Sequence, residues 1–137
     1  MSVTIPDLWP VKLIQTNAVS PASILREQGY KLAEKTRNYI LGRIVSNFSN
    51  ENKFVHQFDL SCDLLGFNTS LVTVAHEFSF YPADFIIHKN IFCHESRFGV
   101  ADVSELETAL RTYFSQTGLI DLINSLYAQC LDDDSAN

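Results

Sequence analysis

The hydrophobic pattern of this chain changes its period twice, and this change limits the folds that the chain can adopt. Through KFVHQFDLSCDLLG (53–66) and SLVTVAHEFSFY (70–81), apolar residues and two histidines alternate with mostly polar residues. Successive side chains of a strand point to opposite faces, so both segments are predicted to be strands with one apolar face. The flanking segments repeat apolar residues at intervals of three and four, which is typical of amphipathic helices.

The N-terminal half is predicted to contain one helix followed by an antiparallel meander. Ser20 is a favourable N-cap and Pro21 suits the first helical position, which places the helix over residues 21–37. Short turns separate the strands, so strands that are neighbours in sequence are expected to pair antiparallel. We predict three strands over residues 39–49, 53–66 and 70–81, with room for a fourth over 83–89.

The last third of the chain returns to a helical period. Ser104 and Glu107 have the spacing of a capping box at the start of a first helix, and Gly118 is expected to end it. A second helix is predicted over residues 119–131. The acidic segment DDDSAN (132–137) is predicted to be a disordered tail.

Together these elements predict an α+β fold in a single domain of residues 1–131. A sheet with one apolar face needs a cover, and the amphipathic helices are the only cover available, so the two C-terminal helices should pack on one face of a three- to four-stranded antiparallel meander. If the second and third strands pair across the turn GFNT, His56 would lie opposite residue 78 or 79 and His76 opposite residue 58 or 59.

Three segments carry a resemblance to other proteins. SILREQGYKLAEKT after a proline, the strands with a YP break, and YFSQTGLIDLINSLYAQ resemble a group of small bacterial proteins of unknown function. The resemblance spans most of the chain and implies a bacterial cytosolic α+β domain. It rests on no catalytic motif and carries no activity over to any residue.

Charge and cysteine usage narrow the classes of partner. The formal net charge is −6, and no run of Lys and Arg forms a basic stripe, so nucleic acid and anionic membranes are not expected as partners. No stretch of 18 apolar residues predicts a membrane span, and the start of the chain does not have the pattern of a signal peptide. Three widely spaced cysteines without a CxxC pattern predict free thiols in a reducing cytoplasm.

Two histidines are the first candidates for a site. His56 and His76 both fall on the apolar faces of their predicted strands and are expected to come within diagonal reach at best. Cys62 shares their face but lies about 20 Å from His56 along the strand, too far to bind the same zinc ion. We therefore predict no metal and no cofactor, and expect each imidazole to be bonded to a backbone carbonyl or a helix side chain.

The segment Cys93-His94-Glu95-Ser96-Arg97 is the second candidate. It combines a thiol, an imidazole and a carboxylate, but neighbours in an extended segment point to opposite faces, so Cys93 and His94 should diverge. We expect a polar segment with Cys93 packed inward, and no catalytic residue.

Carboxylates on the solvent side and the aromatic strand faces complete the candidates. Asp59 and Glu77 could be cross-strand neighbours, and with Asp63 they could act as acid or base, although exposed carboxylates of this kind are usually only solvated. Aromatic residues at period two usually form a core, but they line a ligand pocket if sheet and helices leave a cavity between them.

These patterns favour a non-enzymatic protein-interaction or regulatory module that can form a homodimer. The second C-terminal helix has a wide apolar stripe, extended by Ile120 and Tyr127, which suggests partners on two sides. Near the N-terminus, Trp9 and its apolar neighbours could lie across a neighbouring surface. The alternative is a small enzyme or ligand-binding protein that uses His56, His76 or the Cys93-His94-Glu95 segment.

Overall fold

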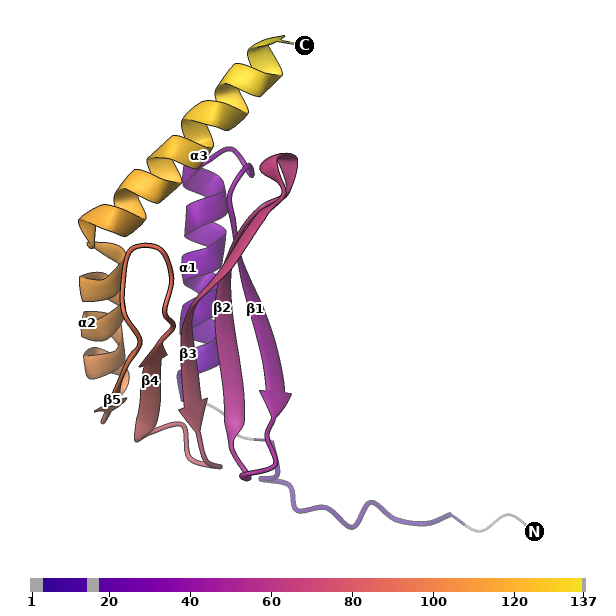
Figure 1. Cartoon of the computed structure of the whole chain (residues 1–137). Coiled ribbons are helices and arrows are strands. Elements are labelled where there is room, and N and C mark those ends of the chain that lie inside the picture. Colours follow the sequence, from indigo (N-terminus) through magenta and orange to yellow (C-terminus); the bar gives the residue numbers. More distant parts are fainter. Residues whose placement is uncertain (1–3, 15–17, 137) are drawn as a thin grey trace.

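The structure is a computed structural model of the whole chain and describes residues 4–14 and 18–136 (Figure 1). It is an α+β fold with one antiparallel sheet of five strands in the order β1-β2-β3-β4-β5. The elements are α1 (Pro21–Lys35), β1 (Leu41–Phe48), β2 (Phe54–Cys62), the 3-10 turn η1 (Asp63–Leu65), β3 (Phe67–His76), β4 (Ala83–Ile87), β5 (Ser96–Val100), α2 (Val103–Phe114) and α3 (Thr117–Ala136).

The predicted order of helix, meander and two helices is confirmed, with five strands instead of three to four. The strand that the sequence did not reveal is β5, which pairs with β4 from Ala83↔Val100 to Ile87↔Ser96. Four of its five residues are exposed at the edge of the sheet, so the segment shows no alternation of apolar and polar residues. The predicted polar connection 93–97 therefore ends inside a strand.

The register of β2 and β3 differs from the predicted one. Phe54 pairs with His76 and His56 pairs with Val74, whereas we predicted residue 78 or 79 opposite His56. The cause is the turn, because β2 ends at Cys62 and η1 leads to Gly66, which is left-handed with φ 64°. This tight connection lets β3 begin at Phe67, three residues before the predicted start, and the pairing shifts accordingly.

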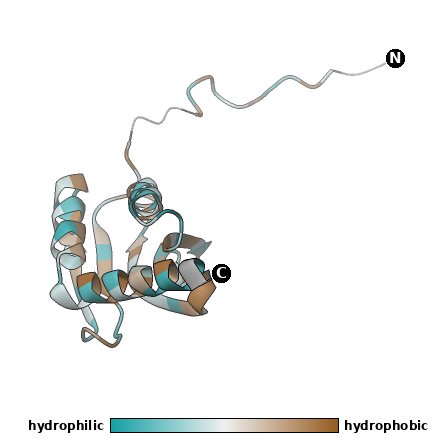
Figure 2. Cartoon of the chain, turned by 90° about the horizontal axis from the view of Figure 1, so that it is seen from above, coloured by the Kyte–Doolittle hydropathy of each residue, from teal (hydrophilic) through white to brown (hydrophobic). Residues whose placement is uncertain are grey.

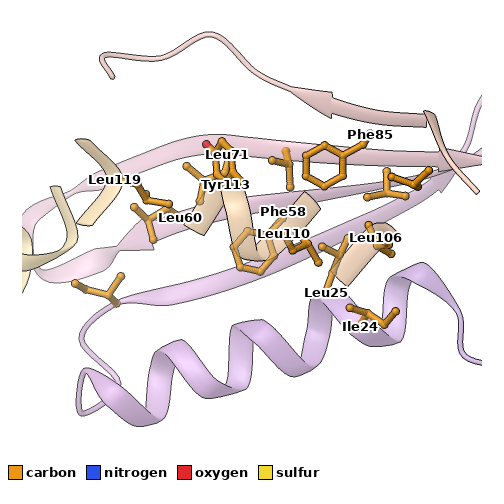
Figure 3. Packing of buried hydrophobic residues seen from close by; sticks show 14 of the residues in the cluster. Ile24, Leu25, Phe58, Leu60, Leu71, Phe85, Leu106, Leu110, Tyr113 and Leu119 are labelled. Atoms are coloured by element: carbon orange, nitrogen blue, oxygen red, sulfur yellow. The ribbon is translucent and has the colours of Figure 1, made fainter. Parts of the chain in front are cut away.

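All three helices contribute to one core on one face of the sheet. Figure 3 shows Phe58, Leu60, Leu71 and Phe85 of the sheet facing apolar side chains of the helices. The helical residues of this core that are at most 3% exposed are Leu25, Leu106, Leu110, Tyr113, Leu119 and Cys130. Burying each large apolar side chain stabilises the fold by about 1.5–3 kcal/mol, so this layer accounts for the position of the helices.

Two predictions about the caps of the C-terminal helices were wrong. The N-cap of α2 is Asp102, whose Oδ1 accepts a hydrogen bond from the Glu105 amide at 2.9 Å, so Ser104 is not the cap. Gly118 does not end a helix but lies at the start of α3, where a Cβ atom would come within 2.6 Å of the Cβ of Phe92. Close packing, not termination, explains this glycine. Helix α3 also continues to Ala136, through the segment predicted to be a disordered tail.

The first described residues do not pack on the body. Residues 4–14, the N-terminal arm, contain no helix or strand and extend away from the sheet (Figures 1 and 2). The arm leaves from the end of the molecule that holds the β1–β2 hairpin, opposite to the end over which α3 lies (Figure 1).

Candidate functional site: an apolar groove and a buried histidine pair

His56 and His76 are brought into direct contact by the register of β2 and β3. Because Phe54 lies opposite His76, the two histidines are diagonal neighbours on the core face. Their Nε2 atoms are 3.0 Å apart, and the two side chains are 8% and 4% exposed. The sequence placed both residues on the apolar face but did not predict that they share a hydrogen bond.

The hydrogen-bond partners of the two Nδ1 atoms determine which atom is the donor in each hydrogen bond of this network. His76 Nδ1 lies 2.7 Å from the Glu77 carbonyl oxygen, which only accepts, so Nδ1 carries the proton. When each ring carries a single proton, His76 Nε2 must accept from His56 Nε2. His56 Nδ1 is then bare and accepts from the Ser46 hydroxyl at 2.7 Å.

This environment disfavours the charged form of His56. Burial lowers the pKa of His56 from 6.5 to about 4, with smaller contributions from His76 and from the Arg26 guanidinium. All four ring nitrogens of the pair already have hydrogen-bond partners. Among the described residues, no group of three or more His, Cys, Asp or Glu side chains is placed to hold a metal ion. The pair is arranged as a hydrogen-bonded structural element.

The Cys93-His94-Glu95 segment is not assembled into a site. Cys93 is half-buried in a turn closed by its bridge to Asn90, and its thiol donates to the Asn90 side chain at 3.3 Å. His94 and Glu95 are exposed. Arg97 lies in β5 and binds the Asp84 carboxylate at 2.9 Å. The five residues therefore point to separate surroundings.

The solvent-side carboxylates are also separate. Asp59 pairs with Ser70 and accepts a hydrogen bond from Gln57, whereas Glu77 follows the end of β3, so they are not the cross-strand neighbours that we predicted. The corrected register again explains the difference. Asp63 binds the Arg43 guanidinium at 2.6 Å on the surface.

One carboxylate that sequence reasoning missed is Asp84. It binds both Lys53, from before β2, and Arg97 of β5. The hydrogen bond from Arg97 is the main cause that holds the pKa of Asp84 below its usual value. This cluster links β4 to its neighbour β5 and, across β3, to the residue that precedes β2. A partly exposed ion pair of this kind contributes little to stability.

An apolar groove between α1 and α3 is a feature that the sequence did not locate. It has a volume of about 480 Å³, and its floor is formed by Phe58, Leu60 and Leu71 of the sheet, each at most 1% exposed. Figure 3 shows Leu60 and Leu71 beside Leu119 of α3 at one end of the core. We use the name groove for the space lined by Gln28, Lys31, Leu32, Lys35, Thr36, Phe58, Leu60, Leu71, Phe114, Leu119, Ile120, Ile123, Asn124 and Tyr127.

The groove has an apolar interior and a basic rim. Lys31 and Lys35 stand one helical turn apart along α1, and both lie at the mouth of the groove. On the opposite wall, Ile120 of α3 keeps 43% of its surface exposed. The sequence did indicate apolar residues on this side of α3. Ile120 and Tyr127 widen the apolar stripe of the last predicted helix beyond the part that packs on the core, and both line the groove.

Comparison with known proteins adds no family to this description. No family model, curated protein or solved structure matches the chain. Within residues 4–14 and 18–136, no helix is both long and apolar enough to cross a bilayer.

Proposed function

We propose that the protein is a non-enzymatic interaction module that binds an apolar segment of a partner polypeptide in the groove between α1 and α3. The observation that supports this most strongly is the groove itself, a cavity of about 480 Å³ with a sheet floor and two helical walls. Amphipathic helices commonly bind in such grooves, with apolar anchors spaced over one or two turns.

The charges at the rim indicate what kind of segment fits. Lys31 and Lys35 are placed to meet an acidic residue that flanks the apolar anchors. Rim charges of this kind mainly set orientation and the rate of association, while the partly exposed apolar side chains of the walls, such as Leu32, Ile120 and Ile123, would provide most of the affinity. The expected partner segment is therefore apolar with at least one acidic neighbour.

An enzymatic function has less support than a binding function. The imidazoles of His56 and His76 use all their ring nitrogens in hydrogen bonds, and neither lines the groove. For the location we propose a reducing compartment such as a bacterial cytoplasm. The support is the cysteine usage, three widely spaced residues without a CxxC pattern.

A small amphipathic anion is the second candidate occupant. The volume of about 480 Å³ lies in the range of ordinary small-molecule pockets, and the rim lysines would meet a carboxylate. This candidate would also make the protein a binding module without chemistry of its own.

A competition experiment tests the proposal. The dye 1-anilinonaphthalene-8-sulfonate is bound to the full chain, and its displacement is measured with a synthetic helical peptide that carries leucines on one face and glutamates on the other, and separately with dodecanoate. Ile120→Asp should weaken binding of dye and peptide by about tenfold, because it puts a charge against the apolar wall. Val45→Asp is the matched control, because Val45 is 52% exposed on β1 and does not line the groove.

Each result decides between the candidates. Displacement by the peptide that is lost in Ile120→Asp and kept in Val45→Asp supports the proposal. Displacement by dodecanoate alone replaces it with the small-anion candidate, and equal binding by both variants would show that the groove is not the site.

A further inference from the structure

The N-terminal arm carries an unusual amount of exposed apolar surface. Six of its eleven residues are large and apolar, and Trp9 is the only tryptophan of the chain. Apolar patches of this extent on a protein surface usually mark a binding surface. The exposed fractions are 79% for Ile5, 84% for Leu8, 70% for Trp9, 102% for Val11, 49% for Leu13 and 82% for Ile14.

The local structure of the arm favours an extended segment that can bind with a small loss of entropy. Pro6 and Pro10 restrict the backbone on both sides of Leu8 and Trp9. The Asp7 side chain accepts a hydrogen bond from the Trp9 amide at 3.0 Å, which holds the short turn between the two prolines. Asp7 is also the only acidic residue of the arm.

The arm therefore has the chemistry that the groove requires. The groove has an apolar floor and a rim with Lys31 and Lys35, and the arm has apolar anchors next to one carboxylate. We propose that the arm of one copy occupies the groove of a second copy, with Leu8 and Trp9 over the floor and Asp7 against the rim lysines. This inference rests on the proposed function, because it names the partner of the same groove.

The geometry favours a second copy over the arm of the same chain. The groove borders the C-terminal half of α1. The arm precedes Pro21 and extends from the end of the molecule opposite to α3 (Figure 1). Helix α1 has 15 residues and spans about 21 Å at about 1.5 Å per residue, so the arm would have to turn back along the whole helix. In its described part, each chain has one arm and one such groove. If each of two copies places its arm in the groove of the other, both grooves are filled and the result is a symmetric dimer.

A competing surface for the arm lies nearer to its own base. The exposed rings of Phe48 and Phe78 are stacked with centroids 6.4 Å apart, and Phe54 contacts both at that end of the sheet. The lysine next to this aromatic patch in sequence, Lys53, is already paired with the Asp84 carboxylate. The arm carries one acidic and one basic residue, Asp7 and Lys12, so charge favours the groove only as the site for the part of the arm around Asp7. Phe78, which is 81% exposed, therefore provides the control position.

Trp9 reports directly on the position of the arm. Its emission maximum and its quenching by acrylamide are measured in the full chain from nanomolar to high micromolar concentration, together with the mass from light scattering. We expect the emission to shift to the blue and quenching to fall severalfold as the mass doubles. Addition of the leucine–glutamate peptide should reverse both changes.

Charge reversal identifies the contact. Asp7→Lys and Lys35→Glu should each raise the dissociation constant of the dimer by about tenfold, and the double variant should regain most of the loss. Phe78→Ser should leave the dimer unchanged. Both Asp7 and Lys35 are exposed, so these changes do not disturb the core.

The outcomes distinguish this inference from the proposed function. Burial of Trp9 that does not depend on concentration would overturn the exchange in favour of the chain's own arm. Loss of Trp9 burial in Phe78→Ser but not in Lys35→Glu would place the arm on the aromatic patch. If Trp9 stays exposed at all concentrations while the peptide still binds in an Ile120-dependent way, the inference fails and the proposed function stands.

Discussion

Acidification should destabilise the protein through His56. His56 has a pKa of about 4 in the folded protein, against the ordinary value of 6.5 that applies in the unfolded chain. Between these two values the unfolded chain binds a proton that the folded chain does not, so the free energy of unfolding falls as the pH drops. Above about pH 6.5 both states are neutral at this residue, and the contribution is constant.

The size of the effect follows from the displacement of the pKa. A shift from 6.5 to about 4 corresponds to about 3 kcal/mol when it is fully expressed, at about 1.4 kcal/mol per pH unit. At about pH 5 the expected loss is about 2 kcal/mol. The charged and titratable groups that act on His56 are His76 and Arg26, while Asp84 titrates at lower pH because its own pKa is depressed by Arg97.

Urea unfolding at about pH 7.5 and about pH 5 measures this difference. We compare the wild-type chain with His56→Gln and with His94→Gln, a matched control at an exposed histidine. His56→Gln should lower stability at the higher pH, because it breaks the bonds to Ser46 and His76, but it should lose about 2 kcal/mol less than the wild type on acidification. Equal pH dependence of the wild type and His56→Gln would refute the reasoning, since the expected difference comes from the lowered pKa of His56.

Two further predictions concern packing and thiol chemistry. In Gly29→Ala the new Cβ would lie 2.5 Å from the Gly42 carbonyl oxygen. The variant should therefore lose about 2 kcal/mol in the free energy of unfolding, measured in urea, because the overpacking outweighs the gain in helix propensity. Gly99→Ala, with its nearest atom at 3.9 Å, should change stability little, and equal losses in both variants would contradict this explanation. In the native protein, only the half-buried Cys93 should react with a thiol reagent at mildly alkaline pH, since burial raises the pKa of Cys130 to about 11. Reaction of more than one of the three thiols before unfolding would speak against the buried arrangement.

Local physics was enough to predict the elements but not the way in which they meet. The alternation around His56 and His76 predicted two strands and the face on which each histidine lies, because side-chain direction in a strand depends only on position. The contact between the two rings depends on the register, and the register depends on where β2 ends and how Gly66 turns the chain. An error in the turn moved every cross-strand pair, while His56 and His76 kept the face that the sequence predicted.

The α+β order, the apolar faces of the strands and the amphipathic stripes of the helices follow from the spacing of residues along the chain, so they could be predicted without coordinates. The separation of α1 and α3 over Phe58, Leu60 and Leu71 could not, because it depends on how the elements pack in space. Two amphipathic helices with apolar stripes of the same width can pack against each other or leave a groove between them. The outcome depends on how closely each helix approaches the sheet. That approach is set by contacts between distant residues, such as Gly29 against Gly42, which no local pattern reveals.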